Sequence, residues 1–262
     1  MNRDRVRQIL NIVLAPAPTL VAILGYLLGT NTNFTATNAT TPQVVPIDYA
    51  FIIWAVIYGG AVVYAIYQLL PRHREDTLLR SIGFYTAFAY LATALWIVAA
   101  QFGGQWLTVI LFFCILASLV AALIQCIRLH DSLTFAERTL VVFPLGVFLG
   151  WTTVATIANV ATALASSGFS NVLLSNQNWA IVMLSIGGLI ASFVTFKSRG
   201  NIGYALTVIW ALMGVVVANV VRTPSVPVVI MASLAATVVA LVLVVSLLLE
   251  LSTRRARTGS RL

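Results

Sequence analysis

Aromatic side chains recur at helical spacing within an apolar stretch of this chain. Phe51, Trp54 and Tyr58 stand at i, i+3 and i+7, which places them on one face of a helix. Such a face is typical of a membrane-interface belt, of ordinary packing or of a pocket wall. Tyr49 fits the belt. Trp54 and Tyr58 lie deeper, where their N–H and O–H groups need a partner inside the protein, so packing and a pocket both stay open.

Two further stretches carry the same kind of pattern. Trp151, Ala155 and Asn159 recur every four residues and form one stripe, while Thr93 and Trp96 share a helix face. An amide at the depth of Asn159 should point away from lipid, where it either bonds a neighbouring helix or anchors a ligand. Thr93 can bond a carbonyl of its own helix, which leaves its role open.

Residues that carry acid–base or metal chemistry are scarce. The sequence has no phosphate loop, no HExxH or GxSxG motif and no pair of intramembrane acids. Cys114 and Cys126 are separated by about 18 Å along a helix, too far for a disulfide. His130 lies in a basic loop, where we expect it to be solvated. The sequence predicts no enzyme activity, no catalytic residue and no metal site.

The composition excludes a water-soluble fold. Hydrophobic residues make up 60% of the chain and charged residues 8%, against about 25% charged residues in soluble domains. A net charge of +8 would suggest nucleic acid in a soluble protein. Here the basic residues lie in short runs between apolar segments, where they set membrane topology. We therefore expect the lipid bilayer as a partner and no nucleic acid.

Eight segments reach the length of about 20 apolar residues that a helix needs to cross the hydrocarbon core. They must be helices, because lipid offers backbone amides no partner. The sequence therefore predicts an all-α integral membrane protein with eight transmembrane helices. Their predicted bounds are Ile9–Gly29, Tyr49–Leu70, Ser81–Gln101, Trp106–Ile127, Thr139–Ala165, Trp179–Phe196, Ile202–Val221 and Val226–Leu251.

The distribution of basic residues predicts the orientation. If the N-terminus is cytoplasmic, all of the 15 Lys and Arg residues except Arg222 fall in segments on the cytoplasmic side. This agrees with the excess of positive charge that cytoplasmic loops carry. We expect a multi-pass protein of the plasma membrane with both termini in the cytoplasm.

These residues resemble the TspO/MBR family, the translocator proteins or tryptophan-rich sensory proteins. That family has a Pro ahead of its second span, a Trp eight residues later and a Tyr four beyond. It has a Trp in its third span, and Trp-x-x-x-Ala-x-x-x-Asn after a Pro in its fifth. The matching positions here are Pro46, Trp54, Tyr58, Trp96, Pro144, Trp151, Ala155 and Asn159.

The resemblance covers roughly residues 1–165 and implies a TspO-like five-helix bundle there. The three additional predicted helices and the basic tail in residues 166–262 depart from the five-helix pattern of the family. It also implies a hydrophobic ligand such as a porphyrin, haem or a sterol, and a homodimer. The sequence departs from the family pattern at Asp48, Ile52 and Thr93, where a Trp, a Pro and an Asn are expected.

The sequence thus predicts a membrane protein that binds a tetrapyrrole- or sterol-like molecule in an aromatic pocket, with a sensory or regulatory role. The loop with Pro46 and Asp48 is expected to act as a lid. The predicted ligand-binding residues are Pro46, Tyr49, Phe51, Trp54, Tyr58, Thr93, Trp96, Trp151, Ala155 and Asn159.

Two alternatives stay open. The chain could be a transporter, or a permease subunit for a small hydrophobic substrate, whose path the last three spans complete. It could also be a ligand-free membrane scaffold that docks partners through faces containing Gly59 and Gly60, and Gly146 and Gly150.

Overall fold

The computed structural model describes residues 3–30, 41–169 and 174–259, with side chains up to residue 253. This part of the chain is helical and has no strand. The helices are α1 Arg3–Leu14, α2 Ala17–Leu27, α3 Ile53–Leu69, α4 Thr77–Gln101, α5 Gln105–Arg128, α6 Phe135–Glu137, α7 Phe143–Ser166, α8 Asn176–Lys197, α9 Ile202–Val221 and α10 Val226–Gly259. Shorter turns are η1 Asp48–Ile52, η2 Pro71–His73, η3 His130–Ser132 and the π-helical η4 Arg138–Val142.

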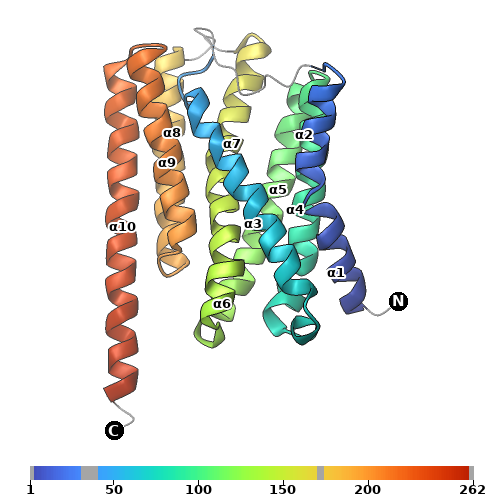
Figure 1. Ribbon diagram of the computed structural model, residues 1–262. Coiled ribbons are helices and arrows are strands. Elements are labelled where there is room, and N and C mark those ends of the chain that lie inside the picture. The colour runs from blue at the N-terminus through green and yellow to red at the C-terminus, as the bar shows by residue number, and fades with distance from the viewer. Residues whose placement is uncertain (1–2, 31–40, 170–173, 260–262) are drawn as a thin grey trace.

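Eight helical segments of the described chain are long and apolar enough to cross a membrane, which confirms the predicted fold class. α1 and α2 together form the first segment, and α6, η4 and α7 form the fifth. Figure 1 shows that α1 begins and α10 ends at the same end of the bundle. We call this the basic end, because it carries Arg7, Arg80, Arg138 and Arg199.

The first span is longer than predicted, and it is interrupted. α1 and α2 meet at Pro16, which has no N–H to donate and so breaks the helical hydrogen bonding. The span begins at Arg3 rather than Ile9, and the polar residues Arg7, Gln8 and Asn11 of α1 are buried inside the bundle. Arg7 is buried and donates to Gln68 Oε1 of α3 over 3.3 Å. This hydrogen bond joins the first span to α3.

A π-helical turn precedes Pro144 in the fifth span. The Phe143 N–H donates to the carbonyl of Arg138, five residues earlier. Pro144 has no N–H to continue the α-helical pattern, and the wider turn leads the chain into α7. A Cβ built on Gly60 would lie 2.9 Å from Pro144 Cβ, so α3 crosses α7 closely at this point.

The last three helices pack onto the first five spans through α7. α7 packs against α5 on one side and α9 on the other, and α10 packs against α8 and α9; the same order is visible in Figure 1. A Cβ on Gly150 would lie 2.6 Å from the carbonyl oxygen of Tyr204, and one on Gly146 would be 2.9 Å from its backbone nitrogen. These two glycines, which the scaffold interpretation assigned to partner docking, therefore pack α9 within the chain.

Candidate functional site

Three indole rings from three helices meet inside the bundle. Trp54 of α3 stacks on Trp96 of α4, with ring centroids 5.4 Å apart and planes at 21°. Trp151 of α7 meets Trp54 edge-on at 6.2 Å and 79°. Tyr58 stacks on Trp54 at 5.3 Å. All three indoles are buried, so they do not form a belt at the membrane interface.

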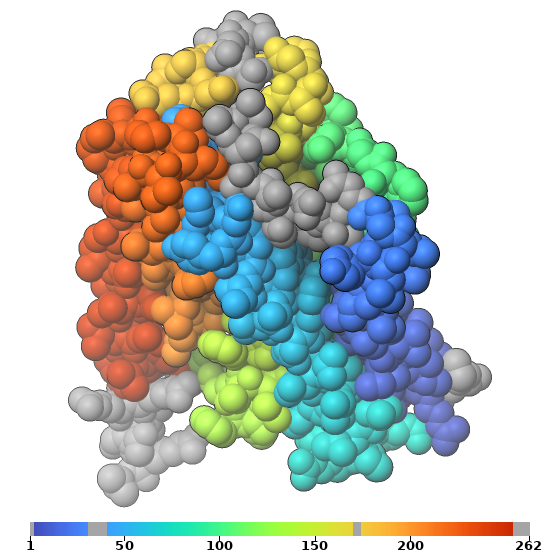
Figure 2. All heavy atoms as spheres, turned by 45° about the horizontal axis from the view of Figure 1, so that its top comes forward, coloured from blue at the N-terminus to red at the C-terminus, as the bar shows by residue number. Residues whose placement is uncertain are grey.

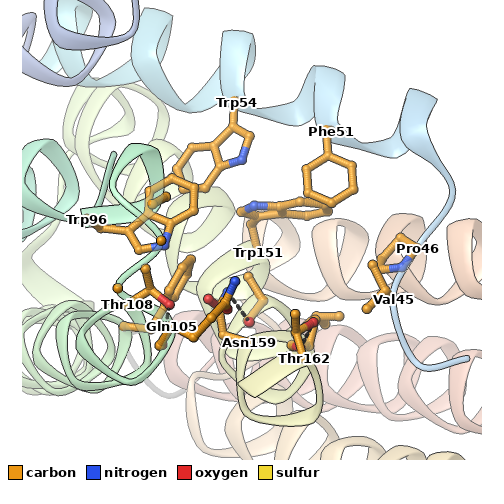
Figure 3. A pocket seen from close by; sticks show the side chains of 17 residues that line it. Val45, Pro46, Phe51, Trp54, Trp96, Gln105, Thr108, Trp151, Asn159 and Thr162 are labelled. Atoms are coloured by element: carbon orange, nitrogen blue, oxygen red, sulfur yellow. Dashed lines mark hydrogen bonds between the residues drawn. The ribbon is translucent and has the colours of Figure 1, made fainter. Parts of the chain in front are cut away.

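A cavity of about 170 Å³ lies beside these indoles, and Figure 3 shows the labelled side chains around it. Its walls come from the segment before α3, from α3, α4, α5 and α7, and from the turn between α4 and α5. Among the described residues that line it, none is ionisable. The predicted binding residues that line it are Pro46, Phe51, Trp54, Trp96, Trp151, Ala155 and Asn159.

The other predicted binding residues do not line the cavity. Tyr58 lies against Trp54 without reaching the lining. Tyr49 is 49% exposed and packs edge-on against Trp210 of α9. Thr93 is fully buried and donates to the carbonyl four residues earlier in its own helix, over 2.7 Å. For Thr93 the local bond within the helix is therefore the one that forms.

Sequence reasoning missed the wall that α5 contributes and part of the wall from α7. Ala158 and Thr162 stand three and seven residues after Ala155 and line the cavity, so applying the i+3, i+4, i+7 pattern of a helix face, rather than every fourth residue, would have found them. Thr108 and Phe112 of α5 also line it. They are one helical turn apart in a uniformly apolar span, where no polar or aromatic stripe sets one face apart.

The cavity contains indole donors without acceptors. Nε1 of Trp54 and Nε1 of Trp151 are buried and have no hydrogen-bond partner among the described residues. A buried donor left without an acceptor costs about 1–3 kcal/mol. Asn159 donates to the Ala155 carbonyl of its own helix over 3.0 Å, and no described bond joins it to a neighbouring helix. An acceptor on a guest molecule that reached either N–H group would remove this cost.

A second polar cluster lies at the basic end. His130 Nδ1 is 3.4 Å from Asp131 Oδ1 and 3.8 Å from Glu250 Oε1 of α10. Only 13% of the His130 side chain is exposed, so the prediction that it is solvated was wrong. The approach of α10 to η3 buries it. Burial lowers the pKa of His130, and the hydrogen bond with Asp131 opposes that shift.

The same cluster has the residue types of a metal site but already holds a cation. The ligand atoms of His130, Asp131 and Glu250 lie within 4.8 Å of one another. Arg199 Nη1 lies 2.8 Å from Asp131 Oδ1 and 3.2 Å from His130 Nδ1. The guanidinium therefore lies where a metal ion would have to bind.

Eight apolar helical segments in the described chain, four of which line an internal aromatic cavity, define a multi-pass integral membrane protein. A family model described as TSPO-like protein matches residues 6–246, and the chain belongs to this family. The match includes α8, α9 and much of α10, and so extends beyond residues 1–165, on which the resemblance was based. Comparisons with curated proteins and with solved structures gave no match.

Proposed function

We propose that this protein binds a hydrophobic small molecule in the cavity between α3, α4, α5 and α7 and acts as a membrane sensor or regulator that responds to it. The observation that carries the proposal is the pair of buried indole N–H groups of Trp54 and Trp151, which have no acceptor in the described chain. Membership of the TSPO-like family supports a role in small-molecule binding or sensing.

The lining favours a ligand that is neutral where it is buried and carries a hydrogen-bond acceptor. No ionisable side chain of the described lining could pair with a buried charge, and an unpaired buried charge is costly. The stacked rings of Trp54 and Trp96 offer flat apolar surface to a ring system. Tetrapyrroles and sterols, implied by the family resemblance, remain the first candidates, with any carboxylates of a porphyrin held outside the cavity.

The size of the cavity adds a condition. Its volume of about 170 Å³ is below the range of about 300–1,000 Å³ that is usual for ligand pockets. A tetrapyrrole therefore fits only if a wall moves. Val45 and Pro46 lie in the segment before α3, and this segment forms a wall of the cavity without being helical at these two residues. This supports the proposed lid at this position.

We infer binding rather than catalysis, because the described lining contains no carboxylate, imidazole or thiol that could transfer a proton. We also infer that the basic end faces the cytoplasm in the plasma membrane. Arg80 pairs with Asp4 near the start of α1, and Arg199 lies 3.7 Å from Glu250 near the end of α10, so basic side chains lie beside both chain ends and support this orientation.

Direct titration tests the proposal. Purified protein in detergent is titrated with protoporphyrin IX and, separately, with a fluorescent sterol, and binding is read from the probe's own emission. We expect saturable binding of at least one probe by the wild type. The triple variant Trp54→Ala, Trp151→Ala, Asn159→Ala should lose it, because its lining loses both donors and two ring faces.

Trp106→Ala is the matched control, since Trp106 is 50% exposed and does not line the cavity. Equal binding by the triple variant, or no binding of either probe by the wild type, would refute the proposal. Net accumulation of a bound probe inside proteoliposomes would instead favour the transporter alternative.

A further inference from the structure

The segment of residues 42–50, which leads into α3, is held on α9 by side chains of α9 and of Arg222, the residue that caps its C-terminus. Asn219 Nδ2 donates to the Gln43 carbonyl over 2.7 Å. Arg222 Nη2 donates to the Val45 carbonyl over 2.9 Å. Figure 2 shows the blue segment after residue 40 lying beside the orange C-terminal helices. Residues far apart in the chain thus form one structure at the end opposite the basic end.

The fastening continues along α9 toward its middle. The Ile47 N–H donates to the Gly214 carbonyl over 3.1 Å, and Trp210 Nε1 donates to the Ala50 carbonyl over 3.0 Å. A Cβ on Gly214 would lie 2.9 Å from Ala50 Cβ and 3.0 Å from Pro46 Cβ. The absence of a side chain at Gly214 therefore lets the segment lie directly on the helix.

The opposite side of this segment faces the cavity. Val45 and Pro46 line it, and Phe51, just beyond the segment, packs edge-on against Trp151 at 5.3 Å. Val45 connects the cavity to the end of α9, because its side chain lines the cavity while its backbone carbonyl accepts a hydrogen bond from Arg222. A movement of the segment away from its present place would change the cavity directly.

Arg222 is suited to this position by its geometry. Its Nη2 reaches the carbonyls of both Val45 and Pro42, at 2.9 and 3.4 Å, while its Nε and Nη1 are buried without a hydrogen-bond partner among the described residues. Burial lowers the pKa of Arg222, and the negative charge of Asp48 opposes this. Arg222 is also the basic residue that the predicted topology leaves on the outer side, so a local role explains its presence better than orientation does.

We propose that Asn219 and Arg222 are positioning residues that hold the 42–50 segment as a wall of the cavity, so that α9 controls how readily the cavity opens. The proposal rests on the proposed function only in taking this cavity as the place of ligand entry. It gives α9, which lies outside the five-helix bundle expected from the sequence, a part in the binding site.

Two measurements without any ligand test this proposal. The first is hydrogen–deuterium exchange of peptides that cover residues 42–50. The second is the rate at which N-ethylmaleimide labels Ala158→Cys, a cavity-lining position, in a background with Cys114→Ala and Cys126→Ala. Asn219→Ala and Arg222→Ala should each raise both rates by about two- to tenfold, the factor that the loss of one hydrogen bond gives.

Three further variants serve as a control and as graded tests. Val220→Ala is the matched control on α9, since Val220 is 60% exposed, and it should leave both rates unchanged. Arg222→Lys keeps a charged donor on a side chain of different length and shape, so it should fall between wild type and Arg222→Ala. Trp210→Phe removes one donor with little change in packing and should raise exchange near Ala50.

If exchange and labelling match the wild type in every folded variant, the proposal is wrong. Because neither measurement uses a ligand, this result is separate from a failure of protoporphyrin IX or the sterol to bind. Faster labelling together with absent probe binding would support the role of α9 and refute the proposed function.

Discussion

The indole of Trp54 lies over the indole of Trp96, with centroids 5.4 Å apart and planes at 21°. The two residues are on α3 and α4, and both line the same cavity. Their stacking turns two separate helical stripes into one aromatic wall. Because offset stacking of such rings contributes about 0.5–1.5 kcal/mol beyond burial, this wall is a stable feature of the site before any ligand binds.

Replacing both unpartnered indoles with phenyl rings separates hydrogen bonding from apolar contact. The double variant Trp54→Phe, Trp151→Phe keeps aromatic faces but removes both donors. A ligand with acceptors should bind more weakly, by about two- to tenfold for each lost bond, in calorimetric titration with whichever probe the wild type binds. Trp106→Phe should bind like the wild type. Unchanged affinity of the double variant would mean that the indoles serve only as apolar surface.

Thr93 should be dispensable for binding, although it shares a predicted face with Trp96. Thr93→Val keeps the shape and removes a hydroxyl that donates within its own helix. We expect ligand affinity equal to wild type and a change in unfolding free energy within about 1 kcal/mol. Asn159→Leu, at a position in the lining, should by contrast change the affinity. An affinity loss in Thr93→Val would place Thr93 in the site.

Gly214→Ala should disturb the wall of the cavity through sterics alone. The added Cβ would lie 2.9 Å from Ala50 Cβ, so the 42–50 segment must shift on α9 and the Ile47 N–H bond to the Gly214 carbonyl must weaken. Amide exchange of this segment should rise. Gly59→Ala, where an added Cβ meets nothing within 4 Å, is the matched glycine control. Equal exchange in both variants would show that the segment adapts without cost.

The stability of the basic end should depend on pH through His130. Burial lowers its pKa in the folded protein below the ordinary value of about 6.5, so the unfolded chain binds the proton more readily. The contribution to stability is therefore fully present above pH 6.5 and is lost as pH falls toward the folded pKa. The charged groups around the imidazole are Asp131, Glu250, Arg138 and Arg199.

This is checked by thermal unfolding in detergent at pH 7.5 and pH 5.5. The wild type should have the lower midpoint at pH 5.5, and His130→Gln should reduce that difference. His73→Gln provides the control, because it removes the other histidine and leaves the cluster with His130 in place. A difference of the same size in His130→Gln would assign the pH dependence to other groups.

Local sequence determined the spans of this protein. A helix that crosses lipid must be apolar over about 20 residues, so hydropathy alone identified eight segments, and the described part of the chain has eight at nearly the same places. Helical periodicity also determined which aromatic residues share a face. Trp54, Trp96 and Trp151 do line one cavity, because a stripe on one side of a buried helix must face the same neighbours.

Only the tertiary structure decided which of the residues that share a helix face line the cavity. Tyr58 and Thr93 satisfy the same periodicity as the lining residues, yet Tyr58 stacks on Trp54 without reaching the lining and Thr93 bonds its own helix. The contact of Gln43 with Asn219 leaves no local pattern in either segment. Periodicity specifies a direction around one helix axis, whereas a cavity depends on the rotation and offset between helices. Close contacts such as Gly150 against Tyr204 set those offsets.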